Sequence, residues 1–318
     1  MDELLQDKNF ALRIAHALHD AYYLNSNQQT LPFILPEEET AVIVKSQKEE
    51  KIAINLAGLY ALETGLGALA AERNKTIIEL LKQIVDGKMD EASMLLLSRF
   101  ANATWKAGQP FQDLNRISRP VFIGAGHLGT ADIKKDEVQI INAATKLLAS
   151  MKEVTNESIE KQMEQLRCLL QDSNYAIEMA AWLHACYYTG QNQDAPPFLT
   201  SDDDTATITK PVKQMKIGTS IAGFYALECG LNYFATIKKI LPSEILTSVV
   251  NDTIGKEDKM LFARFANATW KAGQPFIHLS KIKEETFTPF YFLNEEAIQK
   301  DLAQIKKAAE LVLEEMAN

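Results

Sequence analysis

Two glutamates carry the clearest indication of chemistry in this sequence. Glu63 lies inside a long apolar segment at residues 51–72, and Glu228 occupies the same place in a second such segment at residues 216–237. A carboxylate that is removed from water needs a cation or hydrogen-bond donors, or its pKa rises. The two residues therefore predict either buried structural ion pairs, which we favour, or carboxylates that line a pocket as a base or a ligand anchor.

The expected partners of the first glutamate are cations in the same half of the chain. They are Arg99 or Lys106, or else His19. Arg99 and Lys106 belong to a stretch of thirteen residues, 99–111, that recurs letter for letter at 264–276.

Three polar residues of the repeated stretch share one face of a helix. Arg99, Asn102 and Lys106 form this stripe, and Trp105 lies at its border. A guanidinium, an amide and an ammonium group side by side could bind an anionic or amide-bearing ligand. A solvated polar face is the simpler interpretation, and we favour it. The binding alternative stays open because a surface without a function is expected to differ between the two occurrences of the stretch. Here all thirteen residues are the same.

His19 and His184 occupy corresponding places in the two halves, each at the edge of an apolar helix face. A single histidine without a second ligand is typical of a packed core residue, and the sequence holds no Glu-x-x-His or His-Glu-x-x-His motif. We therefore expect no metal and no cofactor. The candidate ligand-binding residues are His19, Tyr60, Glu63, Arg99, Asn102, Trp105, Lys106, His184, Tyr225, Glu228, Arg264, Asn267, Trp270 and Lys271.

A glycine-rich run from Gly124 to Gly129 matches the pattern G-x-G-x-x-G and follows the strand-like residues 120–123. Its surroundings do not fit a dinucleotide site, because no βαβ unit is predicted around it and no second strand with an acidic residue follows. The corresponding segment 289–294 contains no glycine. We interpret the run as a loop.

The repeated stretch belongs to a longer internal match. Its two occurrences lie 165 positions apart (264 minus 99), and the same offset aligns Tyr22-Tyr23 with Tyr187-Tyr188 and 60–63 with 225–228. A nearly gapless match over about 150 residues predicts a tandem duplication of a whole domain rather than a short solenoid repeat.

Hydrophobic spacing predicts an all-α fold with roughly five helices in each copy, arranged like a bundle. Short β-branched stretches at 40–44 and 205–209 allow a small β-hairpin in each copy. Gly108 is expected to end the helix of the repeated stretch, and Pro110 to prevent its continuation. The helices of the first copy are expected at residues 1–24, 51–72, 75–86, 89–107 and 133–151.

The predicted boundaries place copy one at residues 1–151 and copy two at residues 152–318, with a joining helix at 152–168. We expect the copies to be related by a pseudo-twofold axis, as in a homodimer that became covalent. Their contact should use the apolar helices at 51–72 and 216–237 or the helices of the repeated stretch.

Composition limits the partners. Asp and Glu number 42 against 33 Lys and Arg, a net charge of −9, which argues against binding nucleic acid or an anionic membrane surface. The segment 51–72 is long enough to span a bilayer, but Glu63 inside it favours a buried helix. Three cysteines without paired spacing and an acidic start without an apolar signal region predict a cytoplasmic protein without disulfides.

We expect a ligand- or partner-binding module with two equivalent sites, because the sequence shows no catalytic triad, metal motif or phosphate loop. The ligand is an unknown small molecule or protein, and a monomer with an internal pseudo-dimer is the expected assembly. The alternative is an enzyme with duplicated active sites, in which Glu63 acts as acid or base and His19 or Arg99 assists. Convergence of these three residues on an open cavity would favour the enzyme, and a sealed glutamate would favour a structural role.

Overall fold

The computed structural model describes residues 1–25, 29–151 and 158–317, and it is predominantly helical, as the sequence predicts. The helices of the first half are α1 (Asp2–Gln6), α2 (Lys8–Asn25), α3 (Gln47–Arg73), α4 (Ile77–Val85), α5 (Glu91–Gln112) and α6 (Thr130–Ser150). Those of the second half are α7 (Ile159–Gln171), α8 (Ser173–Thr189), α9 (Val212–Ser220), α10 (Ala222–Lys238), α11 (Pro242–Val250), α12 (Lys256–Ile277) and α13 (Glu295–Ala317). Two short 3-10 turns matter for the site, η3 (Ala125–His127) and η5 (Phe290–Phe292).

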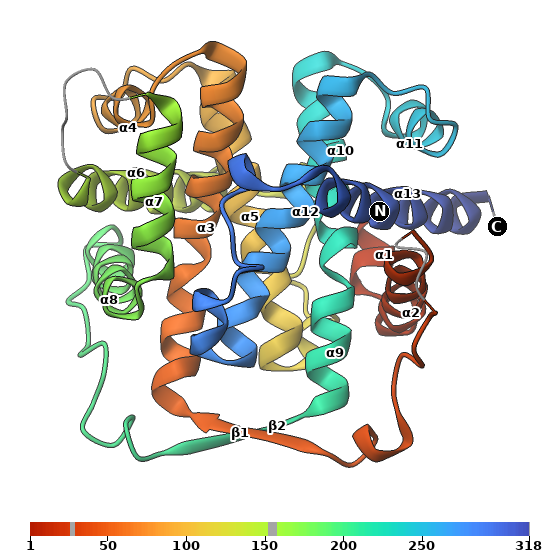
Figure 1. The fold of residues 1–318 in the computed structure, drawn as a ribbon, viewed down its shortest axis with the longest axis horizontal. Helices are drawn as coiled ribbons and strands as arrows, with labels where there is room; N and C mark the ends of the chain where they lie inside the picture. The colour runs from red at the N-terminus through yellow and green to blue at the C-terminus, as the bar shows by residue number, and fades with distance from the viewer. Residues whose placement is uncertain (26–28, 152–157, 318) are drawn as a thin grey trace.

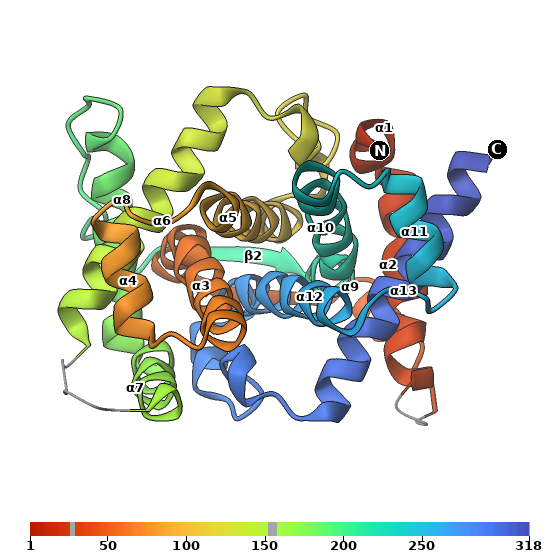
Figure 2. The ribbon, with the colours of Figure 1, turned by 90° about the horizontal axis from the view of Figure 1, so that it is seen from above.

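Four helices form the centre of the molecule. α3, α5, α10 and α12 pack against one another, and the other long helices lie on either side of them (Figure 2). Phe100 of α5 stacks on Phe265 of α12 with ring centroids 4.2 Å apart, and Phe111 stacks on Phe276 at 5.5 Å. We call two residues counterparts when they lie 165 positions apart in the chain. In both stacks each ring meets its own counterpart.

The first long helix of each half packs against the other half. α2 lies on α13 and α9, whereas α8 lies on α3 and α6 (Figure 1). Phe10 of α2 meets Phe224 of α10 edge to face at 5.5 Å, and Trp182 of α8 donates a hydrogen bond to the carbonyl of Asn142 in α6 at 2.9 Å. Each half therefore completes the core of the other.

Strands β1 (Val42–Ser46) and β2 (Thr207–Pro211) form an antiparallel pair at one end of the central helices (Figure 1). Val44 lies opposite Thr209, its counterpart. The hairpin that the sequence allowed in each half is not formed within the described ranges. Each strand leads directly into a helix, since Ser46 caps α3 and Pro211 precedes α9, so the partner strand comes from the other half.

Helices α5 and α12 continue past the glycine and proline that were expected to end them. Pro110 lies inside α5, and Pro275 lies inside α12. Gly108 serves close packing instead of a helix stop, because a Cβ atom there would lie 3.0 Å from the ring of Phe276. Gly87 does adopt the left-handed conformation, with φ of 65°, two residues after α4 ends.

One long helix in the first half corresponds to two helices in the second. α3 is continuous, whereas its counterpart is divided at Ile221 into α9 and α10. The residues before the break are Gly218-Thr219-Ser220, where α3 has Ala53-Ile54-Asn55. Gly and Ser lower helix propensity and are common at kinks, which accounts for the break.

Within the described ranges, α3 is the one helix long and apolar enough to cross a membrane, and 83% of its apolar window is buried inside the molecule. The predicted joining helix is present as α7, where Ser158 accepts a hydrogen bond from the backbone N–H of Lys161 at 3.4 Å. The preceding part of that prediction, residues 152–157, lies outside the described residues.

Candidate functional site

Glu63 is fully buried in α3 and is bound by residues of the second half. Lys271 of α12 donates to its Oε2, and the side chains of both residues have no exposed surface. The Thr64 hydroxyl donates to the same oxygen at 3.0 Å, and the backbone N–H of Phe290 donates to Oε1 at 3.0 Å. Both oxygens of the carboxylate are therefore occupied. Burial lowers the pKa of Lys271, and the charge of Glu63 opposes this shift.

Glu228 in α10 has the same surroundings with the halves exchanged. Its Oε2 accepts hydrogen bonds from Lys106 of α5 at 2.5 Å and from the Cys229 thiol at 3.2 Å. Its Oε1 accepts from the backbone N–H of Ala125 at 2.5 Å. Each of these donors is the counterpart of a donor to the other glutamate. Burial raises the pKa of the Cys229 thiol well above its usual value, so that the thiol acts as a neutral donor.

The sequence predicted the right kind of partner in the wrong half. Lysine of the repeated stretch does neutralise each glutamate, but Glu63 takes Lys271 and not Lys106, Arg99 or His19. Besides packing on the helix of its own half, α3 packs on α12 and α10 packs on α5, so that a lysine of the other half reaches each glutamate.

The glycine-rich run forms a cap over Glu228. Besides the bond from Ala125, the backbone N–H of Gly124 donates to Asp2 at 3.1 Å, and a Cβ atom on Gly124 would lie 2.2 Å from that carboxylate. The run thus serves two carboxylates of this chain. The corresponding cap over Glu63 is η5, in which Phe290 and Tyr291 replace Ala125 and Gly126.

Two aspartates close to the lysines were not among the predicted site residues. Burial raises the pKa of Asp136 in α6 to about 7, although Arg99 and Lys106 oppose the shift. Burial likewise raises the pKa of Asp301 in α13 to about 8, against the charge of Lys271. Both side chains are still partly reached by solvent. The two aspartates are counterparts, which is the signal in the sequence that could have identified them.

The two arginines of the repeated stretch differ in their surroundings. Arg99 is only 4% exposed, and its Nε and Nη1 have no hydrogen-bond partner among the described residues. Arg264 is half-buried with its guanidinium 5.0 Å from the centroid of the Phe290 ring, and its Nε is also without a partner there. Burial lowers the pKa of Arg264, and nearby Glu72 opposes this.

The asparagines also differ. Asn102 Oδ1 lies 3.5 Å from the Cys229 sulfur and is a second possible acceptor for its single proton, whereas Asn267 Oδ1 is buried with no partner in the described part of the chain. The difference follows from the helix packed beside each asparagine. α10 places Cys229 near Asn102, whereas α3 has Thr64 at the corresponding position near Asn267.

The aromatic candidates are packing residues around the two carboxylates. Tyr60 and Tyr225 are fully buried, and each meets a phenylalanine edge to face, Phe287 at 5.2 Å and Phe122 at 5.4 Å respectively. Burial raises the pKa of both hydroxyls far above the usual value. The indoles Trp105 and Trp270 lie 6.1 and 6.3 Å from the same two phenylalanine rings.

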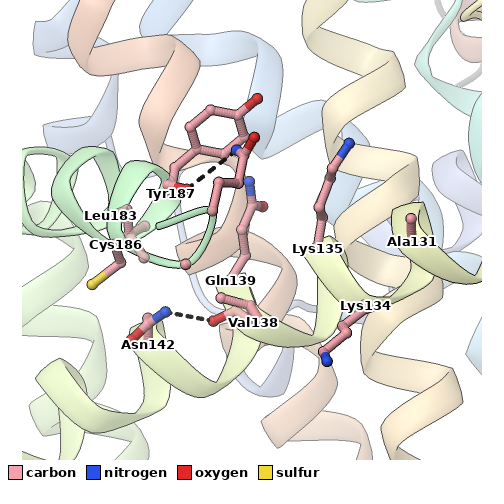
Figure 3. A pocket seen from close by; sticks show the side chains of 11 residues that line it. Ala131, Lys134, Lys135, Val138, Gln139, Asn142, Leu183, Cys186 and Tyr187 are labelled. Carbon is pink, nitrogen blue, oxygen red and sulfur yellow. Dashed lines mark hydrogen bonds between the residues drawn. The ribbon is translucent and has the colours of Figure 1, made fainter. Parts of the chain in front are cut away.

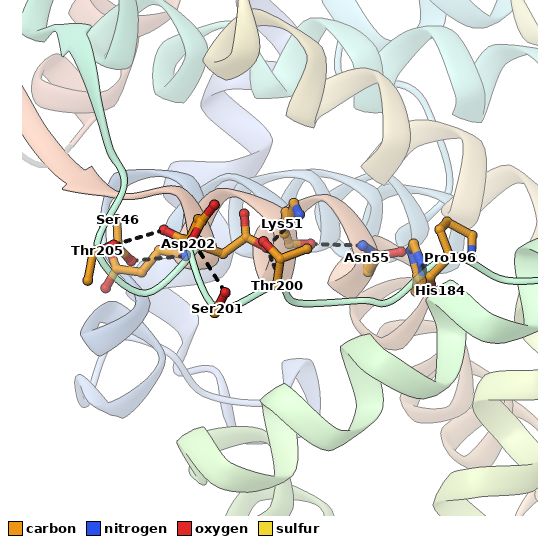
Figure 4. Close-up of polar contacts among 11 residues, drawn as sticks. Ser46, Lys51, Asn55, His184, Pro196, Thr200, Ser201, Asp202 and Thr205 are labelled. Atoms are coloured by element: carbon orange, nitrogen blue, oxygen red, sulfur yellow. Dashed lines mark hydrogen bonds and ion pairs between the residues drawn. The ribbon is translucent and has the colours of Figure 1, made fainter.

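The histidines do not join the carboxylates. His19 Nε2 is hydrogen-bonded to the Leu31 carbonyl at 2.9 Å, and His184 Nε2 to the Pro196 carbonyl at 3.0 Å. Figure 4 shows His184 fixing the loop that follows α8 along α3, where Lys51 forms an ion pair with Asp203 at 2.7 Å. The convergence of His19 with Glu63 and Arg99 that would have favoured an enzyme is not seen, because α2 packs on the other half.

Two candidate residues line pockets: His19 lines a cavity of about 330 Å³ beside α9, and Arg264 lines a larger one. Arg264 contributes to a cavity of about 480 Å³ between the C-terminal ends of α3 and α10 and the start of α12. Leu96 and Leu261 are counterparts, as are Ala68 and Tyr233, so residues of both halves face each other across it. The charged lining residues are Glu72, Lys238, Lys256, Glu257, Asp258 and Arg264.

Neither glutamate lines this pocket or any of four others that we find on the described part of the chain. The described residues also contain no group of three or more His, Cys, Asp or Glu side chains that could hold a metal ion. The two buried carboxylates can join helices of the two halves, whereas the pocket at Arg264 can admit a ligand.

Comparison with known proteins gives no relative: no family model, no curated protein and no solved structure matches this chain.

Proposed function

We propose that this chain is a binding protein for a small molecule that carries a carboxylate or another acidic group. The observation that supports it best is the cavity of about 480 Å³ at Arg264. A half-buried guanidinium whose Nε lacks a partner can give charge-assisted, bidentate hydrogen bonds to an acid. The leucines and Phe234 supply apolar surface for the rest of the ligand.

We propose one such site, although the sequence suggested two equivalent ones. Arg99 is followed by the same twelve residues as Arg264, but it is 4% exposed and lines none of the five pockets. In this proposal the two lysine–glutamate pairs hold the halves together and do not contact the ligand.

We also infer that the chain is a tandem duplication whose copies are related by a pseudo-twofold axis. Contacts that recur between counterparts support it, including the strand register, the two phenylalanine stacks and the two capped glutamates. An experimental structure tests this inference, since residues 1–151 should superimpose on the residues 165 positions later. We propose that the protein acts as a cytoplasmic monomer, which a fluorescent fusion and sedimentation analysis would test.

A thermal-shift screen of carboxylate-bearing metabolites tests the binding proposal. Wild type is compared with Arg264→Gln and with Arg99→Gln, a matched control that changes the same residue of the same thirteen-residue stretch. We expect a ligand to raise the melting temperature of wild type and of Arg99→Gln and to leave that of Arg264→Gln unchanged. Ligands that stabilise Arg264→Gln as much as wild type would contradict the proposal.

The enzyme alternative has less support. It needs a glutamate that can exchange a proton with a substrate, yet all the acceptor oxygens of Glu63 and Glu228 are bonded to groups of the protein. Its proposed helper His19 is bonded to a backbone carbonyl away from them.

A further inference from the structure

A second cavity lies between α6 of the first half and α8 of the second (Figure 3). Its volume is about 200 Å³, which suits a molecule with a single small ring. Figure 3 shows Lys135 and Gln139 extending to the same side of α6 as the Tyr187 ring. The floor is apolar and comes from Ala131, Val138, Leu183 and Gly190.

The counterpart surface, between α13 and α2, is filled by a side chain of the protein. Lys300 Nζ lies 5.4 Å from the centroid of the Tyr22 ring and forms an ion pair with Glu296 at 2.9 Å. The side chain of Lys300 is only 19% exposed as a result. At this end of the molecule the aromatic face is covered and the ammonium group is neutralised.

The cavity lacks a counterpart of Glu296, the residue that holds Lys300 over the Tyr22 ring. Ala131 stands where the counterpart surface has Glu296, and Lys135 pairs instead with Asp132 at 3.3 Å. The Lys135 side chain is 50% exposed, and within the described residues no cation lies over the Tyr187 ring, which is 43% exposed. In the part of the chain that the structure describes, no ammonium group covers the Tyr187 ring and the apolar floor as Lys300 covers the Tyr22 ring on the counterpart surface.

The charge of the cavity favours an anionic occupant. Lys134 replaces the neutral Gln299 of the counterpart surface and Ala131 removes an acid, while Asp132 adds one in place of Ala297, so that the net gain is one positive charge. The exposed Lys135–Asp132 pair is weak enough for the ammonium group to turn toward a ligand. Cys186 also lines the cavity, but burial raises the pKa of its thiol, and we assign it a packing role.

We propose that this cavity binds a small aromatic carboxylate. The aromatic ring stacks on Tyr187 and covers Val138 and Leu183, while the carboxylate is bound by Lys135; Lys134 extends to the other side of α6 and adds only its positive charge (Figure 3). This site is independent of the pocket at Arg264, and either proposal can fail without the other.

Isothermal titration with three probes of similar size tests the charge requirement. Benzoate, neutral benzamide and cationic benzylamine are titrated into the full chain. We expect benzoate to bind about tenfold more tightly than benzamide, because one charge-assisted contact at a partly exposed site is lost. We expect no binding of benzylamine. Binding of benzylamine as tight as that of benzoate would overturn the proposal, as would a lack of heat with benzoate.

One substitution should close the cavity without disturbing the core. Ala131 is exposed, and Ala131→Glu recreates the glutamate that holds Lys300 on the counterpart surface, so Lys135 should move over Tyr187. We expect benzoate affinity to fall by about tenfold or more. The matched control is Glu296→Ala, which makes the reverse exchange on the counterpart surface and should leave the affinity for benzoate unchanged. If Ala131→Glu binds benzoate as well as wild type does, the ligand does not occupy this cavity.

Discussion

Helices α5 and α12 contain the same thirteen residues and do not have the same surroundings. The faces that point to the centre of the molecule make the same contacts. Each lysine neutralises a buried glutamate of the opposite half, and each phenylalanine stacks on its counterpart. Their edges differ, since Arg99 is buried beside Asp136, whereas Arg264 lies against Phe290 and faces a pocket.

The cause of the difference lies outside the repeated stretch. Phe290 of the cap over Glu63 corresponds to Ala125 of the cap over Glu228, and the thiol beside Asn102 corresponds to the hydroxyl of Thr64. The identical lysines and phenylalanines thus join the two halves in the same way. The residues packed around them differ, and this difference determines that Arg264, and not Arg99, can contact a ligand.

Loss of one lysine should have the largest effect, and it tests whether the inward faces are equivalent. Lys271→Met leaves Glu63 buried without a cation, and we expect the free energy of unfolding to fall by about 3–5 kcal/mol. Lys106→Met should cost a similar amount, because Glu228 keeps two corresponding donors. Urea denaturation measures both. The double variant Glu63→Gln/Lys271→Met should recover most of the loss, and a single variant that unfolds like wild type would show that the pair is dispensable.

The two aspartates should make stability depend on pH. Their folded-state pKa values, about 7 for Asp136 and about 8 for Asp301, lie above the ordinary value of 3.8. Between those limits the folded state holds protons that the unfolded state has released, so the stability that these two groups contribute is fully present below about pH 4 and is lost as the pH rises toward 8. Asp136→Asn and Asp301→Asn should flatten this dependence.

At pH 8 we expect the free energy of unfolding of each asparagine variant to exceed that of wild type by on the order of 2 kcal/mol. This is less than the two pKa shifts alone would give, because solvent reaches both side chains. Urea denaturation between pH 5 and pH 8 measures it. Wild-type stability that does not change over this range would show that the aspartates are solvated like ordinary surface carboxylates.

Two glycines of the repeated stretch should tolerate a methyl group to different degrees. A Cβ atom on Gly273 would lie 2.8 Å from the Phe111 ring, which Gly218 also approaches, whereas on Gly108 it would lie 3.0 Å from Phe276. We expect Gly273→Ala to lower the free energy of unfolding by about 1 kcal/mol after the gain in helix propensity, and Gly108→Ala by less. Thermal unfolding of the two variants measures the difference, and equal melting temperatures would contradict it.

Much of this arrangement could be predicted from sequence, because hydrophobic spacing locates α3, α5 and α10 and a lone acid in an apolar helix requires a cation. The sequence could not tell which lysine serves which glutamate, since Lys106 and Lys271 have identical neighbours along the chain. That choice depends on the crossed packing of the halves, which no local pattern records. Asp136 could have been identified from its counterpart Asp301, but helical spacing gives no sign that a polar side chain at the edge of a face is desolvated.

Exchange of the donors beside the two glutamates should have the smallest effect. The Thr64 hydroxyl donates to Glu63 at 3.0 Å, and the Cys229 thiol donates to Glu228 at 3.2 Å. Because a hydroxyl is the stronger donor and threonine is accommodated at the counterpart position 64, Cys229→Thr should raise the free energy of unfolding by about 0.5 kcal/mol, and Thr64→Cys should lower it by a similar amount. Opposite shifts in urea midpoint would show that donor strength at this position affects the two glutamates in the same way. Shifts of the same sign would mean that packing around Asn102 and Asn267, rather than donor strength, distinguishes the two environments.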